Sequence, residues 1–319
     1  MNSNARRTVG IGMLTLASLI WGLAFSAQKQ MLVHMGPITC NCLRFLLGAA
    51  FLLLLALGRS FLLKRGGARR RLSVSSAELR GGILCGVLLF AASLTQQIGL
   101  TESNVGSAAF ITALYIVLVP ALGGIFGRRV PLGIWLCVLA ALGGAYLLTV
   151  VGSAPSSDGI GSLRALFSAI GSARLVFYLG DALVFLCAIV YSFHILTVDR
   201  YADRCDGITL SMIQFAVAGA LGILPMLLFE EVSLSGVLGG LPELLYLGIL
   251  SSGVAFTLQV LGQARIQPTL ASMLMSLESV FGAIGGALLL GESMNAAEIF
   301  GCAIIFAAIL LSRLVRCET

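Results

Sequence analysis

Charge is the scarcest property of this sequence. Of its 319 residues only 11% are Asp, Glu, Lys or Arg, whereas 58% are hydrophobic. A soluble domain carries roughly a quarter of its residues as charges to keep its surface hydrated. A chain with less than half that proportion cannot cover a fold of this length with polar side chains. The composition therefore excludes an ordinary soluble protein and predicts a surface that mostly faces lipid.

Residues for metal and nucleophilic chemistry are also scarce. There are two histidines, and neither an HExxH nor a GxSxG motif occurs. Eight cysteines are scattered without CxxC or zinc-like spacing, most of them within apolar runs, where cysteine behaves as a small apolar residue. The sequence therefore predicts no cofactor, no metal and no disulfide, and an intramembrane enzyme acting on lipid stays only as an alternative.

Ten apolar runs are long enough to cross a bilayer, which takes about 20 residues as a helix. The predicted spans are 9–28, 37–58, 80–100, 104–126, 131–151, 178–198, 208–229, 241–262, 268–290 and 296–315. The first run is longer than the roughly 7–15 residues of a signal-peptide core, so we expect it to be retained. The sequence thus predicts an all-α polytopic membrane protein.

The basic residues indicate the orientation. With the N-terminus in the cytoplasm, sixteen Lys and Arg fall in inside loops or tails, three (Lys29, Arg164, Arg174) fall in outside loops, and Arg44 lies within a span. Cytoplasmic loops are the ones enriched in Lys and Arg, so both termini are expected in the cytoplasm. This distribution accounts for the net charge of +6 without a nucleic-acid partner.

The two halves of the chain align with each other. At an offset of 170, Arg44 to Ala50 matches Gln214 to Ala220 and Trp21 falls on Tyr191; at an offset of 163, Gln96 falls on Gln259 and Tyr115 on Glu278. Five spans in each half make the second half enter the membrane from the opposite side, as in many secondary carriers. We expect five-helix units at 1–151 and 178–319. The external segment 152–177 between them is read as a linker or a short interfacial helix.

Four motifs carry a resemblance to a known family: Ile20-Trp21-Gly22, Arg44-Phe45, Gly106-Ser107-Ala108-Ala109 with Pro120 beyond it, and Leu290-Gly291-Glu292. With them the chain resembles the drug/metabolite transporter superfamily in its bacterial EamA-domain branch. The resemblance implies spans one to four and six to nine around a central cavity for a small-molecule substrate, in the inner membrane. Spans five and ten would lie outside the cavity, where a homodimer contact is expected. The first half departs from the pattern, with Gly127-Arg128-Arg129 where the second half has Gly291-Glu292.

Glu278 is the sharpest functional candidate. It lies ten residues into the predicted span 268–290, near the bilayer midplane, where a charged side chain costs about 2.5–3.5 kcal/mol on insertion scales. A carboxyl group at that depth suits a reversible proton carrier or a counter-ion for a cationic substrate. The alternative is a structural Glu between helices. Its repeat partner Tyr115 would present a ring and a hydroxyl to the cavity, or pack like any other tyrosine.

Other polar and aromatic residues complete the predicted cavity. They are Trp21, Gln96, Tyr191, His194 and Gln259, followed by a second group of Arg44, Gln97, Gln214 and Met275. Contacts between helices are the alternative for the glutamines and the histidine, a place among the interfacial aromatic residues is the alternative for Trp21, and a lipid-facing position is the alternative for Met275. Arg44 is expected to extend outward to the membrane surface, with recruitment of an anionic substrate as the alternative. The predicted function is a secondary active transporter of a small, partly apolar organic solute, proton-coupled through Glu278. An uncoupled facilitator or exchanger, and more remotely a channel or scaffold, are the alternatives.

Overall fold

The computed structural model describes residues 3–65, 74–103, 105–148, 179–289 and 296–312, and every regular element in these ranges is a helix. The predicted linker at 152–177 and the motif Leu290-Gly291-Glu292 lie outside the described residues.

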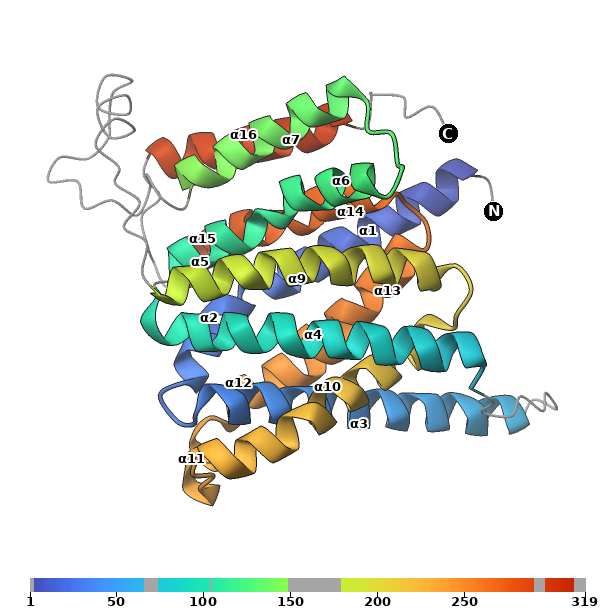
Figure 1. Ribbon diagram of the computed structural model, residues 1–319, viewed down its shortest axis with the longest axis vertical. Helices are drawn as coiled ribbons and strands as arrows, with labels where there is room; N and C mark the ends of the chain where they lie inside the picture. Colours follow the sequence, from blue (N-terminus) through green and yellow to red (C-terminus); the bar gives the residue numbers. More distant parts are fainter. Residues whose placement is uncertain (1–2, 66–73, 104, 149–178, 290–295, 313–319) are drawn as a thin grey trace, which may run out of the picture.

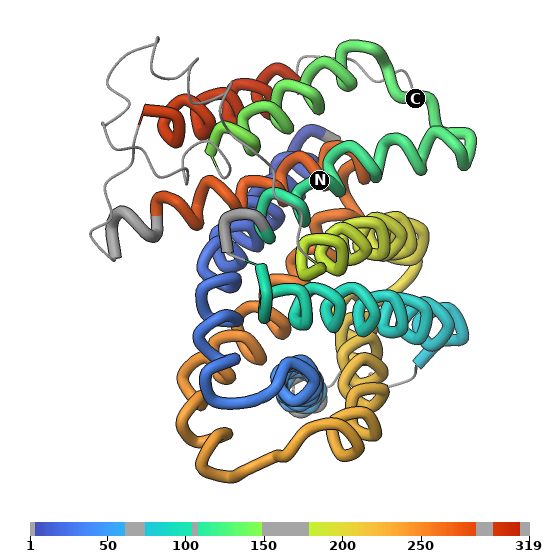
Figure 2. The backbone as a smooth tube through the Cα atoms, turned by 60° about the vertical axis from the view of Figure 1, so that its left-hand side comes forward, coloured from blue at the N-terminus to red at the C-terminus, as the bar shows by residue number. Residues whose placement is uncertain are grey.

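Consecutive long helices run back and forth through the molecule (Figures 1 and 2). The first half contains α1 (Ser3–Gly22), α2 (Ala24–Met31), α3 (Pro37–Arg65), α4 (Ser76–Glu102), α5 (Val105–Ala113), α6 (Tyr115–Ile125) and α7 (Leu132–Tyr146). The second half contains α9 (Leu179–Ala202), α10 (Gly207–Phe229), α11 (Leu234–Gly239), α12 (Leu241–Leu245), the π-helix η2 (Tyr246–Phe256), α13 (Thr257–Gln263), α14 (Pro268–Met275), α15 (Leu277–Leu289) and α16 (Ala296–Ser312).

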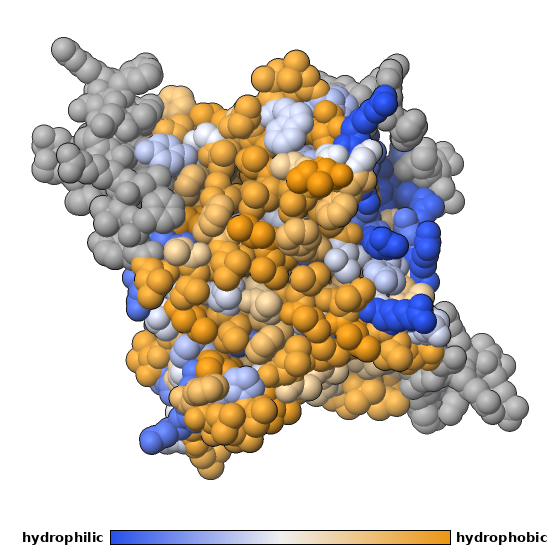
Figure 3. Space-filling model, in the orientation of Figure 1, coloured by the Kyte–Doolittle hydropathy of each residue, from blue (hydrophilic) through white to orange (hydrophobic). Residues whose placement is uncertain are grey.

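The lengths and surface of these helices are those of a multi-pass membrane protein. Within the described ranges, seven helical stretches are long and apolar enough to cross a membrane, and three shorter apolar stretches cover Leu132–Tyr146, Pro268–Ile284 and Ala296–Ser312. Hydrophobic residues cover the middle of the face shown in Figure 3, and hydrophilic ones gather toward its right-hand edge and lower left corner. The number of crossings and the side of each terminus remain predictions.

Several predicted spans are interrupted helices. The first is broken at Leu23 between α1 and α2, the fourth at Leu114 between α5 and α6, and the ninth at Ser276 between α14 and α15. The span predicted at 241–262 is built from α12, the π-helix η2 and α13. Leu23, Leu114 and Ser276 keep right-handed helical dihedral angles, so each break is a local bend, and irregular or π-helical turns inside a helix often mark functional sites. The interruptions therefore point to the middle of the bundle as the place for a site.

Two side-chain pairs join residues that the internal repeat aligns with each other. The rings of Phe45 and Phe215, which are 170 residues apart, stack with centroids 5.8 Å apart and planes 14° from parallel. Tyr115 and Glu278, 163 residues apart, share a hydrogen bond. The helices that the repeat aligns also pack on each other, α3 on α10 and α7 on α16. An approximate twofold axis through these contacts would explain why aligned residues meet.

The closest backbone approaches follow the same offsets. A Cβ atom at Gly99 of α4 would lie 2.7 Å from the carbonyl oxygen of Gly180 of α9, so only glycine fits there. The aligned pair is Gly262 of α13 and Gly10 of α1, where a Cβ at Gly262 would lie 3.2 Å from the carbonyl oxygen of Gly10. Small residues let membrane helices pack closely. These two equivalent crossings lie at opposite ends of the bundle.

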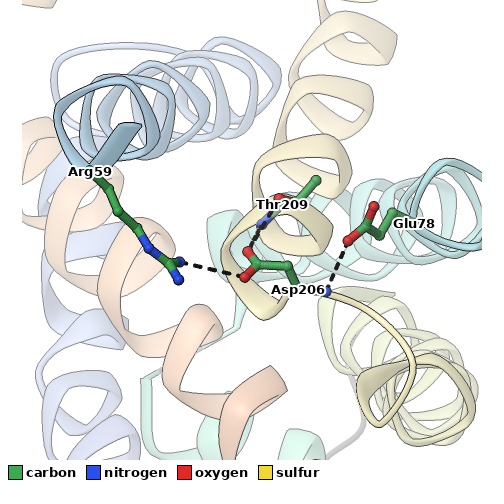
Figure 4. A network of polar contacts seen from close by, with 4 residues as sticks. All are labelled: Arg59, Glu78, Asp206 and Thr209. Carbon is green, nitrogen blue, oxygen red and sulfur yellow. Dashed lines mark hydrogen bonds and ion pairs between the residues drawn. The ribbon is translucent and has the colours of Figure 1, made fainter. Parts of the chain in front are cut away.

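A polar network joins α3, α4 and α10 near the end of the bundle where α4 and α10 begin (Figure 4). Asp206 accepts hydrogen bonds from the backbone N–H (3.1 Å) and hydroxyl (3.2 Å) of Thr209, and so caps α10. Its own N–H donates to Glu78 at 3.0 Å, and its carboxylate lies 3.5 Å from Arg59. The network ties three helix ends together at a distance from the helix interruptions.

Candidate functional site

A cavity lies where the interrupted helices meet, and eight of the eleven sequence-predicted residues line it. Its walls are Trp21, Ala24, Phe25, Gln28, Arg44, Gln96, Thr112, Tyr115, Tyr191, Ile195, Ser251, Phe256, Gln259, Met275 and Glu278. Its volume of about 60 Å³ is far below the roughly 300–1,000 Å³ of a typical drug-sized site. At about 10–15 Å³ per water, it holds several water molecules or one small solute in this conformation.

Glu278 and Tyr115 occupy equivalent places beside two helix interruptions. Tyr115 is the first residue of α6 after the break at Leu114, and Glu278 lies in the first turn of α15 after the break at Ser276. The Tyr115 hydroxyl donates to Glu278 Oε1 at 3.0 Å, and both side chains are buried. Ser276 keeps right-handed helical dihedral angles, and the N–H of Ser279 bonds to its carbonyl oxygen at 3.3 Å, so α14 and α15 meet at a bend. The break thus places a supported acidic group in the cavity wall.

Arg44 is the cationic group of the cavity. Only 3% of the residue is exposed, and its Nη1 donates to Gln28 Oε1 at 2.9 Å. The guanidinium also lies 4.7 Å from the centroid of the Phe45 ring, and the Tyr191 side chain interacts with it. The expectation that Arg44 extends outward to the membrane surface is therefore wrong. Gln28 of α2 and Tyr191 of α9 hold the side chain between helices instead.

Aromatic side chains form the apolar part of the wall. Trp21 and Phe256 meet edge to face with centroids 4.8 Å apart, and Phe25 and Tyr191 complete the group. The indole N–H of Trp21 donates to the Ser251 carbonyl in the π-helix at 3.2 Å. Trp21 thus lies inside the bundle, away from the lipid interface where tryptophan is often found.

The paired glutamines both reach the cavity. Gln96 donates from Nε2 to the Thr112 hydroxyl at 3.1 Å, and Gln259 donates to Gln263 Oε1 at 2.9 Å. The Oε1 atom of Gln259 is buried with no hydrogen-bond partner among the described residues. A buried amide without its full set of partners is an available contact for a bound solute.

Three candidates lie outside the cavity lining. His194 is fully buried, and its Nε2 lies 3.1 Å from Gln214 Oε1, whereas His194 Nδ1 and Gln214 Nε2 are buried without a hydrogen-bond partner among the described residues. Gln97 points to α2, where it donates to the Gln28 backbone carbonyl at 3.3 Å. Sequence reasoning placed these three in the cavity because they are polar, but their positions on the helix turn them toward neighbouring helices.

Seven lining residues were missed: Ala24, Phe25, Gln28, Thr112, Ile195, Ser251 and Phe256. Helical spacing could have found several of them, because Phe25 and Gln28 lie four and seven residues after Trp21 on one face, and Ile195 lies four after Tyr191. Ser251 and Phe256 belong to the π-helix, whose altered phase a standard helical spacing does not predict.

The described residues contain no cluster of three or more His, Cys, Asp or Glu that could hold a metal ion. Polar contacts also join helices away from the cavity lining. At one end the Lys29 ammonium donates to the carbonyl oxygens of Leu100 and, at 3.1 Å, Ser103, where a cation suits the C-terminal end of α4. At the other end Arg128 and Asp199 form an ion pair at 2.6 Å.

With this geometry established, comparison with known proteins gives the class. The chain belongs to the EamA-like transporter family, whose model matches residues 8–150 and again residues 178–314. A transporter of uncharacterized function from Archaeoglobus fulgidus is 24% identical over 305 residues, covering 93% of this chain and 83% of that protein. A protein crystal structure with 20% identity shares the fold with a TM-score of 0.71, covering 98% of this chain and 97% of the other.

Family membership and the apolar helices make this chain a multi-pass membrane transporter. The names of the family and of the relative point to transport and away from catalysis.

Proposed function

We propose that this protein is a secondary active carrier that moves a small, partly apolar organic solute across the inner membrane by alternating access, coupled to protons through Glu278. The observation that carries the proposal is the position of Glu278. It is a buried carboxyl group in a cavity wall, at a helix interruption, with a neutral tyrosine hydroxyl as its hydrogen-bond partner. Such a group can take up or release a proton as its surroundings change, which is what coupling requires.

The proposed architecture has ten crossing helices in two five-helix units, 1–151 and 178–319, of opposite orientation, with both termini in the cytoplasm. Two matches to the same family model support the repeat, and so do the aligned contacts between Phe45 and Phe215 and between Tyr115 and Glu278. Inverted repeats around a central site are the arrangement through which many carriers alternate access.

Alternating access requires that each end of the cavity opens in turn. In the proposed orientation, Lys29 and the end of α4 close the external side, and Arg128 with Asp199 contributes to the cytoplasmic side. Opening the external side would break the contacts of Lys29, and opening the cytoplasmic side would break the Arg128–Asp199 pair.

The test begins with a thermal-shift screen of the purified protein against metabolites, because a ligand that binds the native state raises its unfolding temperature. The best ligand is then radiolabelled, and its uptake into proteoliposomes is measured with and without a pH gradient. We expect Glu278→Gln to keep exchange of the ligand across the membrane but to lose accumulation driven by the gradient. Glu231→Gln is the control, since Glu231 is exposed and does not line the cavity.

Normal accumulation by Glu278→Gln under the gradient would remove the coupling role and leave an uncoupled facilitator or exchanger as the function. Currents far above carrier rates would instead favour a channel. The homodimer expected through spans five and ten corresponds to α7 and α16 and stays a prediction, to be checked by the mass of the purified protein in detergent.

A further inference from the structure

A group of buried polar side chains lies directly behind the cavity wall, between α9 and α10. The ring centroid of His194 lies 6.2 Å from those of Tyr191 and Phe256, which both line the cavity. His194 itself does not line the cavity, and its Nε2 atom lies 3.1 Å from Oε1 of Gln214 in α10. Ser211 comes three residues before Gln214 and so lies on the same face of α10. We call His194, Gln214 and Ser211 the His194 cluster.

Each member of the His194 cluster has a polar atom without a hydrogen-bond partner. Nδ1 of His194, Nε2 of Gln214 and Oγ of Ser211 are buried and bond to no described residue. All three side chains are inaccessible from outside the bundle. Buried polar groups in native proteins are normally paired, either with protein groups or with ordered water. Three unpaired atoms in one cluster therefore indicate that water is bound there.

The internal repeat places unpaired polar atoms at the equivalent positions of α3. At the offset of 170, Ser211 aligns with Asn41 and Gln214 aligns with Arg44. Nδ2 and Oδ1 of Asn41 and Nε of Arg44 are also buried without a partner in the described part of the chain. Each pair lies near the start of its helix, and α3 and α10 start at opposite ends of the bundle (Figure 1). The unpaired atoms thus belong to the architecture of the repeat and are not one local packing defect.

The His194 cluster lies between the cavity and the end of the bundle at which α10 begins. Ser211 and Gln214 come four and seven residues after the first residue of α10, so they lie about 6 Å and about 10 Å inside that end. The same end carries Asp206, whose side chain is 30% exposed and joins the polar network of Figure 4. On the cavity side, Oε1 of Gln259 in the wall is unpaired as well. Polar groups therefore continue from the cavity wall to a network in contact with solvent.

We propose that the His194 cluster holds ordered water and forms the route by which Glu278 exchanges its proton with the cytoplasm. The inference deepens the proposed function and rests on the part of it in which Glu278 binds a proton. The Glu278 carboxyl group releases its proton to water in the cavity and becomes a carboxylate. The proton passes along the hydrogen bonds of the cluster into cytoplasmic water, and uptake is the reverse. A neutral imidazole can accept a proton on one ring nitrogen while the other releases one, which suits His194 to this transfer.

The first measurement is the rate at which Glu278 takes up a proton, and it needs no substrate. The purified full-length protein is placed in lipid nanodiscs, and a light flash releases protons from a caged-proton compound. Time-resolved infrared spectroscopy then follows the absorption of protonated carboxyl groups. The part of this signal that disappears in Glu278→Gln belongs to Glu278, and its rise gives the rate of protonation.

The variants separate the route from the packing around it. His194→Phe keeps a ring at this position but removes both nitrogen atoms, and should slow the protonation of Glu278 about 100-fold, the lower end of the range for a positioned proton donor or acceptor. Ser211→Ala removes one unpaired hydroxyl and should slow protonation less. Its matched control is Ser192→Ala, which should leave the rate unchanged, because the Ser192 hydroxyl is equally buried but donates to the Ala188 carbonyl oxygen at 2.7 Å.

The second measurement detects the water itself. Hydroxyl radicals made from water by an X-ray pulse oxidise buried side chains that touch bound water and leave dry ones unchanged. His194 should be oxidised at a measurable rate, whereas Met273, fully buried in the apolar core, should not. Unfolding curves show whether each variant folds. If His194→Phe does not, the comparison of Ser211→Ala with Ser192→Ala and the labelling of His194 decide the matter.

The proposal is overturned if His194→Phe and the unaltered protein protonate Glu278 at the same rate, if Ser211→Ala and Ser192→Ala do so, or if His194 is oxidised no faster than Met273. These outcomes are separate from those for coupling. Slow protonation in His194→Phe together with normal accumulation of the ligand by Glu278→Gln would keep the route and refute coupling alone. If no infrared signal disappears in Glu278→Gln, Glu278 binds no proton, and the route and the coupling are both refuted.

Discussion

Two adjacent glycines in α7 offer a direct test of the packing between α7 and α16. A Cβ atom at Gly144 would lie 2.8 Å from the Gly301 carbonyl oxygen and 2.9 Å from the Ile305 side chain. At Gly143 a Cβ atom would meet no heavy atom of a described residue within 4 Å, and this residue is exposed. The same substitution to alanine therefore meets backbone at one position and open space at the next.

The expected difference between the variants follows from these distances. Both substitutions gain the same helix propensity, about 1 kcal/mol, so that gain cancels in the comparison. Gly144→Ala must also push α7 and α16 apart by several tenths of an ångström, and overpacking of this kind costs about 1–3 kcal/mol. Gly144→Ala should therefore be less stable than Gly143→Ala by about 1–3 kcal/mol.

The free energy of unfolding is measured in mixed micelles by denaturant titration with tryptophan fluorescence, since Trp135 in α7 is a reporter close to the change. Transport of the ligand should be similar for both variants, because neither glycine lines the cavity. Equal stability of the two variants, or a more stable Gly144→Ala, would refute the close packing of α7 on α16.

Three further predictions concern contacts at the ends of the helices. The Glu230 carboxylate accepts hydrogen bonds from the backbone N–H groups of Ile38 at 2.8 Å and Thr39 at 2.7 Å, at the start of α3. Glu230→Ala should therefore lower the free energy of unfolding by about 1–2 kcal/mol. The control Glu231→Ala should change it by less than about 0.5 kcal/mol. Loss of the Lys29 contacts in Lys29→Met should speed labelling of a cysteine introduced at Ala24, which is buried in the cavity wall, and Lys29→Arg should label at the original rate. Equal rates for Lys29→Met and the unaltered protein would contradict the proposed closing role of Lys29. A double-mutant cycle on Arg128 and Asp199 should give a coupling energy of about 0.2–1 kcal/mol, because Arg128 is half exposed, and a coupling of zero would remove this pair from the cytoplasmic closure.

The internal repeat is the feature of the sequence that says most about the site. It paired Tyr115 with Glu278 through an offset of 163, and the two side chains share a hydrogen bond across the interface between the halves. Residues near an approximate twofold axis meet the residues with which they align, so a sequence offset becomes a spatial contact. The same reasoning was less useful for Gln96 and Gln259, which bond to different residues within their own halves.

Helix interruptions were not predictable from breaker residues. Pro120 lies inside α6 and Pro225 inside α10, whereas the breaks occur at Leu23, Leu114 and Ser276. A proline in a membrane helix is tolerated when neighbours satisfy the freed backbone groups. The breaks instead occur beside the cavity wall, where Tyr115 and Glu278 begin or nearly begin their helices.

Hydropathy and basic-residue counts were sufficient to predict an all-helical membrane protein, because the bilayer accepts few other structures and makes each crossing long and apolar. They could not tell which face of a helix lines the cavity. Lipid and protein core are both apolar, so hydropathy does not distinguish a side chain that lines the cavity from one that contacts a neighbouring helix. His194, Gln97 and Gln214 were predicted in the cavity but bond to neighbouring helices. Arg44 was predicted at the membrane surface but is buried. Only the packing between helices that are distant in the sequence decides which face of each helix lines the cavity. This packing brings Arg44 and Glu278 to one cavity.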